Sequence, residues 1–275
     1  MDKNIENHYS SDDLELKIRA ALELAGKDPD RLELKEISII DQLHTGGHLA
    51  TQTLGERCGL ASTDKILDAG CGIGGSSRFL SKHFNSSVTG IDLVEAFVRV
   101  ARMLTRAAGL ENRVSFIQGD LEDLDIQEST FDVVWCQHTL MNISDKQKTF
   151  NEFYRVLKPG GRLILHEIVQ KENQEIHLPV PWANSHLISF LETREHLTSL
   201  AAETGFTPDF INDATDQAKK WWQKVLAAAP KKGDPPRPLG PHIIFGNNGK
   251  EFGRTMTANL HENRIGLMEA LLIKT

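Results

Sequence analysis

The sequence has few of the features that mark secreted, metal-binding or membrane proteins. Its 275 residues include only three cysteines, Cys58, Cys71 and Cys136, without CxxC or zinc-type spacing. We interpret them as small buried residues of a cytoplasmic protein, and we expect no metal site. No run approaches the ~18 apolar residues that a membrane helix needs. The polar, acidic start, MDKNIENHYSSDDLELK, argues against a secretory signal.

The sequence also lacks long basic runs and internal repeats. The formal net charge is -7, and the lysines and arginines are scattered without a long basic run, which argues against a nucleic-acid partner. The remaining composition, 40% hydrophobic and 25% charged, is that of a soluble globular protein. The length fits one domain with additions better than two full domains.

Short apolar runs alternate with helical patterns in the middle of the chain. Repeated units of this kind predict an α/β fold, in which a parallel sheet carries helices on both faces. Each run is five to seven residues long and mostly apolar, as is typical of strands buried on both faces. The predicted strands are Lys65–Ala69, Ser87–Ile91, Val114–Gln118, Phe131–Cys136 and Arg162–Ile168.

The flanking segments are helical in character. Patterns over Asp13–Ala25 and Gly46–Cys58 predict an N-terminal helical cap, residues 1–60, ahead of a core over residues 61–211. The core should also contain a helix, Arg194–Glu203, and the strand-like stretch TPDFIN.

A long segment precedes the last predicted strand, Leu267–Ile273, which lies in residues 265–275. Helical patterns over Asp213–Ala229 and Lys250–Glu262 flank a proline-rich linker. Because residues 212–264 are too many for a simple connection, we interpret them as an inserted lid.

The stretch ILDAGCGIGGSSRF, residues 66–79, fits two glycine patterns at once. Gly70-x-Gly72-x-x-Gly75 is a dinucleotide fingerprint, whereas Asp68-x-Gly70-x-Gly72-x-Gly74 fits a different ligand. Glycines let the backbone approach a ligand closely, and the following helix start attracts an anion. A phosphate and a carboxylate would suit this loop equally well.

Acidic residues at three successive strand ends narrow the choice of ligand. Asp92 can accept two hydrogen bonds from a ribose diol, and it can also cap the next helix. Asp120 can accept from the amino group of an adenine, or it can belong to a turn. Together with Asp68, these acids suit a cationic, ribose-containing ligand better than a pyrophosphate.

Five segments in order resemble the motifs of class I S-adenosylmethionine (SAM)-dependent methyltransferases: ILDAGCGIGG, GIDL, QGDLEDL, FDVVWCQHTL and LKPGGRLIL. The resemblance spans about residues 41–169 and implies a Rossmann-like, mostly parallel, seven-stranded sheet whose last strand is antiparallel. DQLHTGGHLATQTL, residues 41–54, resembles the small-molecule subgroup, which includes glycine-sarcosine, phosphoethanolamine, tocopherol and sugar or polyketide methyltransferases. A simple helix-initiating turn is the alternative for HTGG.

The resemblance implies SAM as the cofactor and assigns its contacts. The loop would contact the methionine portion, Asp92 the ribose, Leu93 the adenine face and Asp120 the adenine amino group. Gln137 and His138 would lie beside the methionine and sulfonium, HTGG would close over the carboxylate, and Asp68 would organise the loop or meet the amine through water. The implied cofactor residues are Thr45, Gly46, Gly47, Asp68, Gly70, Cys71, Gly72, Asp92, Leu93, Asp120, Leu121, Gln137 and His138.

Methyl transfer from a sulfonium needs a general base only if the acceptor loses a proton. Five histidines are candidates: His44, His48, His138, His166 and His186. His138 is the best placed, and Glu167 at the end of the next strand is the alternative catalytic residue. Related enzymes often carry a histidine four residues beyond His138, where this sequence has Asn142. That departure leaves the use of a base open.

The predicted function is methyl transfer from SAM to an oxygen, nitrogen or carbon of a small molecule, in biosynthesis or secondary metabolism. Aromatic and apolar residues favour an apolar or aromatic acceptor: Pro181, Trp182, Phe190, Trp221, Trp222, His242 and Phe245. Lys231, Lys232 and Arg237 could serve an anionic acceptor but are more typical of a solvated linker. Two alternatives are an NAD-dependent oxidoreductase and a non-catalytic SAM-binding subunit. We expect no membrane partner, and both a monomer and a homodimer stay open.

Overall fold

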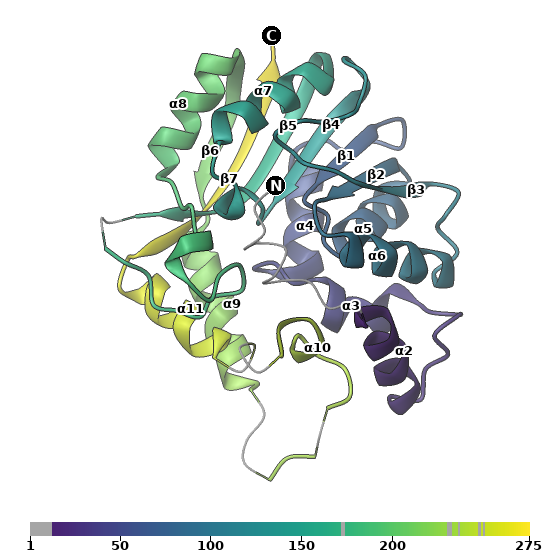
Figure 1. The fold of residues 1–275 in the computed structure, drawn as a ribbon. Coiled ribbons are helices and arrows are strands. Elements are labelled where there is room, and N and C mark those ends of the chain that lie inside the picture. Colours follow the sequence, from purple (N-terminus) through teal and green to yellow (C-terminus); the bar gives the residue numbers. More distant parts are fainter. Residues whose placement is uncertain (1–12, 172–173, 230–232, 236, 247–248, 250) are drawn as a thin grey trace.

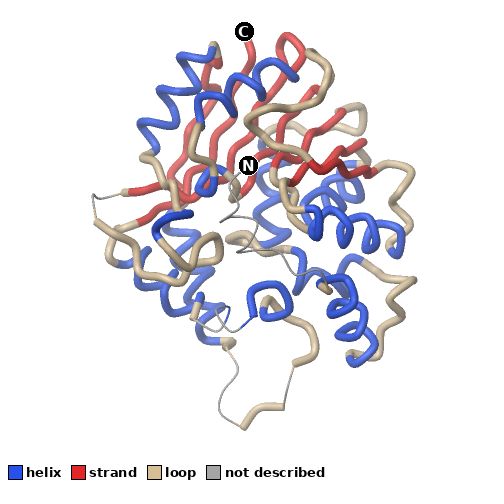
Figure 2. The backbone as a smooth tube through the Cα atoms, in the orientation of Figure 1, coloured by secondary structure: helices blue, strands red, loops and turns tan. Residues whose placement is uncertain are grey.

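The structure is a computed structural model that describes residues 13–171, 174–229, 233–235, 237–246, 249 and 251–275. Seven strands form one sheet in the order β3-β2-β1-β4-β5-β7-β6 (Figures 1 and 2). The strands are β1 (Lys65–Ala69), β2 (Ser87–Asp92), β3 (Val114–Gln118), β4 (Phe131–Gln137), β5 (Leu157–Gln170), β6 (Phe206–Asp213) and β7 (Ile265–Lys274).

The pairing confirms the predicted Rossmann-like sheet. β1 to β5 pair in parallel, and β7 runs antiparallel to both β5 and β6. Several strand ends differ from the predicted ones by one or two residues, and the largest difference is that β5 begins at Leu157 rather than at Arg162. Leu157 already pairs with Phe131 across a register shift, so the predicted glycine turn is an irregular start of the strand.

Helices cover both faces of the sheet. Alternate residues of β1 point to opposite faces, so Ile66 packs with α4 to α6 and Leu67 packs with α7 and α8. The helices are α2 (Leu14–Leu24), α3 (Leu34–Asp41), α4 (Gly47–Arg57), α5 (Gly75–Phe84), α6 (Glu95–Ala107), α7 (Lys146–Val156), α8 (Arg194–Thr204), α9 (Thr215–Ala227), α10 (His242–Phe245) and α11 (Phe252–His261), with short 3-10 turns η1 (Leu140–Asn142) and η2 (His186–Ile188).

α3 and α10 are short and do not correspond to any of the predicted helices. α3 nevertheless has a capping box, in which Glu33 and Glu36 bond to each other's backbone N–H groups. No helix in the described ranges is long and apolar enough to cross a membrane.

Two helical groups lie at one end of the molecule, α2 with α3 and α9 with α11, with α10 between them (Figure 1). α9 and α11 pack on each other and form an apolar cluster with Val180, Trp182 and Ile188. Ile243 and Ile244 of α10 pack against the cluster formed by α2, α3 and α6. The segment between β6 and β7 therefore contacts the N-terminal helices.

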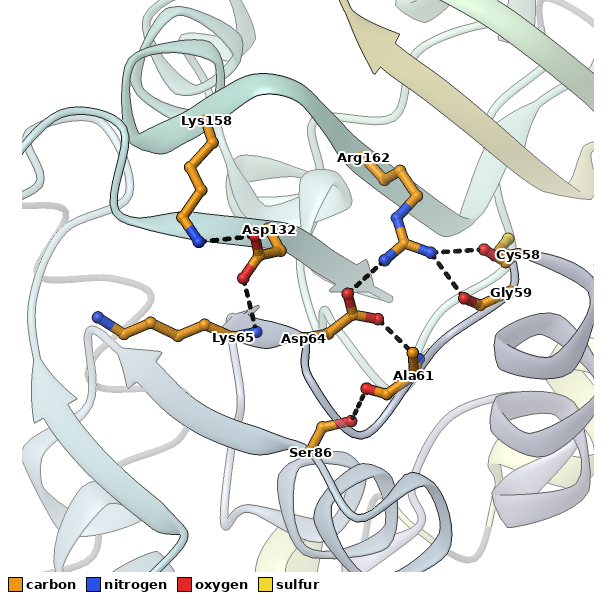
Figure 3. A network of polar contacts seen from close by, with 9 residues as sticks. All are labelled: Cys58, Gly59, Ala61, Asp64, Lys65, Ser86, Asp132, Lys158 and Arg162. Carbon is orange, nitrogen blue, oxygen red and sulfur yellow. Dashed lines mark hydrogen bonds and ion pairs between the residues drawn. The ribbon is translucent and has the colours of Figure 1, made fainter.

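A polar network at the amino-terminal ends of the strands ties the end of α4 to the sheet (Figure 3). The Arg162 guanidinium donates to Asp64 Oδ1 at 2.6 Å and to the carbonyls of Cys58 and Gly59 at 2.9 Å each. Asp64 Oδ2 in turn accepts from the N–H of Ala61 at 2.7 Å. One half-buried arginine thus holds the connection from α4 to β1.

A second ion pair in the same view is more exposed. Lys158 Nζ donates to Asp132 Oδ1 at 2.6 Å, and the Lys65 N–H donates to Asp132 Oδ2 at 2.9 Å. The side chains of Lys158 and Asp132 are 43% and 30% exposed, against 20% and 9% for Arg162 and Asp64. The two pairs therefore allow a matched comparison.

We expect Arg162→Met to lower the free energy of unfolding by about 2–4 kcal/mol, because it leaves the Asp64 carboxylate and two carbonyls without their donor. Lys158→Met should cost only about 0–1 kcal/mol, as exposed pairs do. Urea unfolding of both variants measures the difference. Equal losses would contradict the assigned role of Arg162.

Candidate functional site

A cavity of about 460 Å³ opens where β1, β2, β3 and β4 end. The chain order of the sheet reverses between β1 and β4, and ligands of open parallel sheets bind at such points. The loops after these four strands supply most of the lining. Asp41, Leu43 and His44 add to it from the N-terminal side, and Pro181, Trp182 and Phe245 from the C-terminal side.

Most of the sequence-predicted cofactor residues line this cavity. They are Gly70, Cys71, Gly72, Asp92, Leu93, Asp120, Leu121, Gln137 and His138. Thr45, Gly46, Gly47 and Asp68 are not part of the lining. Of the HTGG motif, only His44 reaches the cavity.

The glycine loop is shaped by two positive φ angles. At Gly70, with φ of +76°, a Cβ would lie 2.3 Å from the Thr139 side chain, so only glycine lets these loops meet. At Gly72, with φ of +53°, a Cβ would meet nothing within 4 Å. A side chain there would occupy open space beside the cavity, which glycine leaves free for a ligand.

Asp92 holds the loop in place. The N–H of Gly72 donates to its Oδ2 at 2.8 Å, and the N–H of Val94, just ahead of α6, donates to Oδ1 at 2.9 Å. Burial raises the pKa of Asp92 to about 6. The carboxylate therefore fixes the helix start and also lines the cavity, so both roles considered for it are compatible.

The other two strand-end acids differ in position. Asp120 lines the cavity and accepts from the N–H of Glu122 at 3.0 Å, as a turn residue does. Asp68 is buried outside the lining and accepts from the Ser77 hydroxyl. Burial, followed by the neighbouring Asp92, raises the pKa of Asp68 to about 7. The hydrogen bond between Asp68 and Ser77 links β1 to α5, and the role of Asp68 in organising the loop stays a prediction.

The HTGG motif forms the start of α4 and closes one side of the site. His44 Nε2 lies 2.9 Å from the Gly47 carbonyl and 3.1 Å from Thr51 Oγ1. Thr45 Oγ1 accepts from the indole N–H of Trp222 in α9 at 3.1 Å. Thr45 therefore joins the N-terminal cap to the lid instead of lining the cavity.

A buried ion pair that the sequence analysis missed connects the cap to the glycine loop. Arg78 of α5, fully buried, donates to Asp41 Oδ2 at 2.9 Å and to the Ile73 carbonyl at 2.8 Å. Asp41 also lines the cavity. A charged residue among the apolar positions of α5 was the available signal, but no spacing rule links residues 37 positions apart.

Three imidazoles cluster beside the cavity, of which those of His44 and His166 are buried and that of His138 is half-buried. The ring centroid of His138 lies 5.1 Å from that of His166 and 6.2 Å from that of His44. Burial lowers the pKa of His44 to about 4, that of His166 to about 3 and that of His138 well below its usual value. All three rings are therefore neutral at pH 7 and act as polar, uncharged groups.

His138 differs from the other two rings. Its φ of +55° is left-handed, a conformation that costs a non-glycine residue about 1–3 kcal/mol. Its Nε2 is buried and has no hydrogen-bond partner among the described residues. Because His138 lines the cavity, a ligand there would contact the residue that carries this buried nitrogen.

The structure places Glu167 elsewhere than expected. Its side chain is fully buried in β5, outside the cavity lining. The carboxylate accepts from the N–H groups of Thr139 and Leu140 and from the Cys136 thiol. Its oxygens are occupied inside the protein, so we do not retain Glu167 as an alternative base. Burial raises the pKa of its carboxyl to about 7.

The remaining candidate histidines, His48 and His186, do not line the cavity. His48 packs on Phe79 with ring centroids 5.7 Å apart, and His186 is exposed. Within the described residues, no group of three or more His, Cys, Asp or Glu is arranged to hold a metal ion.

Several apolar residues of the cavity lining come from the C-terminal half of the chain. They are Met141, Ile143, Pro181, Trp182 and Phe245. Of the other aromatic residues predicted to favour an apolar acceptor, Phe190, Trp221, Trp222 and His242 do not line it. Asn142, where relatives often have histidine, donates to the carbonyls of Trp182 and Ile188 at 2.8 and 2.9 Å. It thereby holds the Trp182 loop.

The charge of the cavity is negative. Asp41, Asp92, Asp120 and Glu122 line it, and its described lining contains no lysine or arginine. Arg237 is exposed and lies near the Ala228 carbonyl, whereas Lys231 and Lys232 lie outside the described residues. The described lining therefore suits a cationic ligand better than an anionic one.

Comparisons with known proteins agree with this site. A family model described as a methyltransferase domain matches residues 67–165. Methyltransferase GfsG from Streptomyces halstedii is 29% identical over 70% of each chain. Phosphoethanolamine N-methyltransferase 1 from Triticum aestivum is 35% identical over 68% of this chain but only 37% of its own length. This chain thus spans under two fifths of the plant relatives it matches.

The fold also matches solved structures. Geranyl diphosphate C-methyltransferase from Streptomyces coelicolor A3(2), solved with Mg2+, geranyl diphosphate and S-adenosyl-L-homocysteine, has a TM-score of 0.67 and 20% identity. The match covers 83% of this chain and 78% of that chain. At this identity the likeness supports the fold alone.

The buried imidazoles predict a pH dependence of stability. Because folding lowers the pKa of His44 from 6.5 to about 4, the unfolded chain binds more protons than the folded chain below pH 6.5. The free energy of unfolding therefore decreases as the pH is lowered. We expect His44→Gln to remove up to ~1.4 kcal/mol per pH unit of this slope between pH 6 and 4. Urea unfolding across this range measures it. His186→Gln, which replaces an exposed ring, should leave the slope unchanged, and equal slopes in all three proteins would contradict the prediction.

Proposed function

We propose that this chain, which belongs to the class I SAM-dependent methyltransferases of the small-molecule kind, methylates a hydroxyl group of an uncharged, largely apolar acceptor. The observation that carries this proposal is the buried, unpartnered Nε2 of His138 at the lining of the acidic cavity. It is the kind of group that receives a hydroxyl proton.

The cavity fits SAM on its own chemistry. Glycine at position 72 leaves open the space that a Cβ would fill, and Asp92 and Asp120 offer acceptors for ribose hydroxyls and an adenine amino group. When bound, SAM supplies a methyl group activated by its sulfonium. The N–H groups of Gly70, Cys71 and Gly72 already donate to acceptors within the protein. The loop therefore lets a ligand approach its backbone closely, but these three N–H groups are not its donors to that ligand.

The acceptor class follows from the other lining residues. Met141, Ile143, Pro181, Trp182 and Phe245 can desolvate an apolar molecule. The described lining has no lysine or arginine to pair with a phosphate, and the carboxyl groups of Asp92, Asp120 and Glu122 would repel one, whereas Asp41 is paired with Arg78. This lining argues against the phosphorylated acceptors that the names of several relatives indicate.

His138 is the proposed base. A neutral imidazole with a free Nε2 can accept the proton that a hydroxyl loses during transfer. Because burial keeps its pKa well below 6.5, the ring stays unprotonated throughout the neutral range. Gln137, whose Oε1 accepts from Ser76 at 2.9 Å and Trp135 at 3.1 Å, helps to fix the neighbouring wall.

An oxidoreductase using a nicotinamide finds no support in the family match or in the named relatives. A biosynthetic role, a cytoplasmic location and a monomeric or homodimeric state stay predictions from the sequence.

A panel of matched acceptors tests the proposal. The protein is incubated with SAM and one acceptor at a time. The acceptors are neutral apolar alcohols and phenols, their phosphate esters, phosphoethanolamine and geranyl diphosphate. Release of S-adenosylhomocysteine is measured for each. We expect turnover of at least one neutral hydroxyl compound and none of the phosphorylated ones.

Two outcomes would contradict the proposal. Turnover of phosphoethanolamine or geranyl diphosphate would show that the acidic cavity accepts an anion. Calorimetric binding of S-adenosylhomocysteine without turnover of any compound would instead favour a non-catalytic SAM-binding subunit.

A further inference from the structure

Glu167 is a buried carboxylate whose surroundings suit an anion. Its side chain is fully buried, and both oxygens accept from the Thr139 N–H, at 3.0 and 3.1 Å, while Oε2 also accepts from the Leu140 N–H at 3.2 Å. Two consecutive backbone N–H groups that converge on one anion form the arrangement known as a nest. Here the anion belongs to the neighbouring strand of the same chain.

The residue just before this nest is His138. With its left-handed φ of +55°, His138 turns the backbone so that the next two N–H groups face β5. The His138 N–H itself donates to the His166 carbonyl at 2.9 Å, and its ring stacks on that of His166 at an interplanar angle of 20°. The backbone is therefore held from one side by Glu167, and the ring is held from the other by His166.

The same turn contacts the glycine loop. Thr139 Oγ1 donates to the Ala69 carbonyl at 3.0 Å, and its side chain occupies the space where a Cβ at Gly70 would lie. A shift of the turn would consequently move His138 relative to the loop that precedes the cavity. The contact with Gly70 limits such movement only while Glu167 keeps its two N–H donors.

We propose that Glu167 is a positioning residue, whose carboxylate holds the His138–Leu140 turn so that His138 Nε2 faces the acceptor. This inference rests on the proposed function, because it assigns to Glu167 an effect exerted through the base. The sequence expectation that Glu167 could itself take the proton is replaced, since its oxygens are engaged away from the cavity.

Glu167→Gln tests the inference, because an amide keeps the size but offers an N–H₂ to one of the two backbone donors. We expect kcat with the most active panel alcohol to fall about 10- to 100-fold, a part of what a general base contributes. The dissociation constant of S-adenosylhomocysteine, measured by calorimetry, should change less than about threefold. Cys136→Ala, which removes a different donor to the same carboxylate, should retain wild-type kcat.

A double-mutant cycle separates positioning from a general structural role. In a His138→Ala background, Glu167→Gln should change kcat by less than about threefold, because the base through which it acts is gone. A full 10- to 100-fold loss in that background would overturn the inference. If Glu167→Gln does not fold, Glu167→Asp keeps the charge while withdrawing the carboxylate, and the same cycle applies.

A titration without cofactor or acceptor gives an independent readout. The His138 ring is followed by nitrogen NMR against pH in the ligand-free protein. This ring faces the rings of His166 and His44. Glu167 faces the Cys136 thiol and the more distant Lys146 ammonium. We expect the pKa of His138 to rise toward 6.5 in Glu167→Gln, as the ring moves toward solvent. An unchanged pKa would overturn the inference. If no panel alcohol is methylated, the proposed function fails, but this titration still decides the role of Glu167.

Discussion

The parallel pairing of β1 with β2 and with β4 is the constraint on which the site depends. It brings the ends of these strands to one edge of the sheet, where the glycine loop, Asp92 and His138 meet. The loops that follow β1 and β4 can approach each other because Gly70 has no side chain to meet Thr139. From this edge the N-terminal cap and the lid complete the cavity, and the hydrogen bond between Thr45 and Trp222 joins them.

The sheet and the cofactor side of the cavity could be predicted because their signals are local. Apolar runs with intervening amphipathic stripes fix strand and helix type, and parallel strands place their following loops at one edge. Gly72 and Asp120 lie in the loops after β1 and β3, and Asp92 is the last residue of β2, so their place at this edge followed from the topology. The boundary of β5 was less certain, because the pairing of Leu157 with Phe131 depends on the neighbouring strand.

The acceptor side could not be predicted to the same depth, because its contacts join distant parts of the chain. Asp41 meets Arg78 only after the N-terminal helices have packed, and Asn142 meets the Trp182 carbonyl only after the segment that follows β5 has packed against η1. Glu167 shows the same limit. Its place at the end of an apolar strand suggested a base on the rim, whereas its side chain points to the N–H groups that follow His138.

The most direct test of this account is a crystal structure with S-adenosylhomocysteine bound. We expect its ribose at Asp92, its adenine near Asp120 and Leu121, and its sulfur facing the space between His138 Nε2 and Trp182. In this arrangement an acceptor hydroxyl fits between the base and the methyl donor. A sulfur that faces away from His138, or a His138 Nε2 bonded to another protein group, would contradict the account.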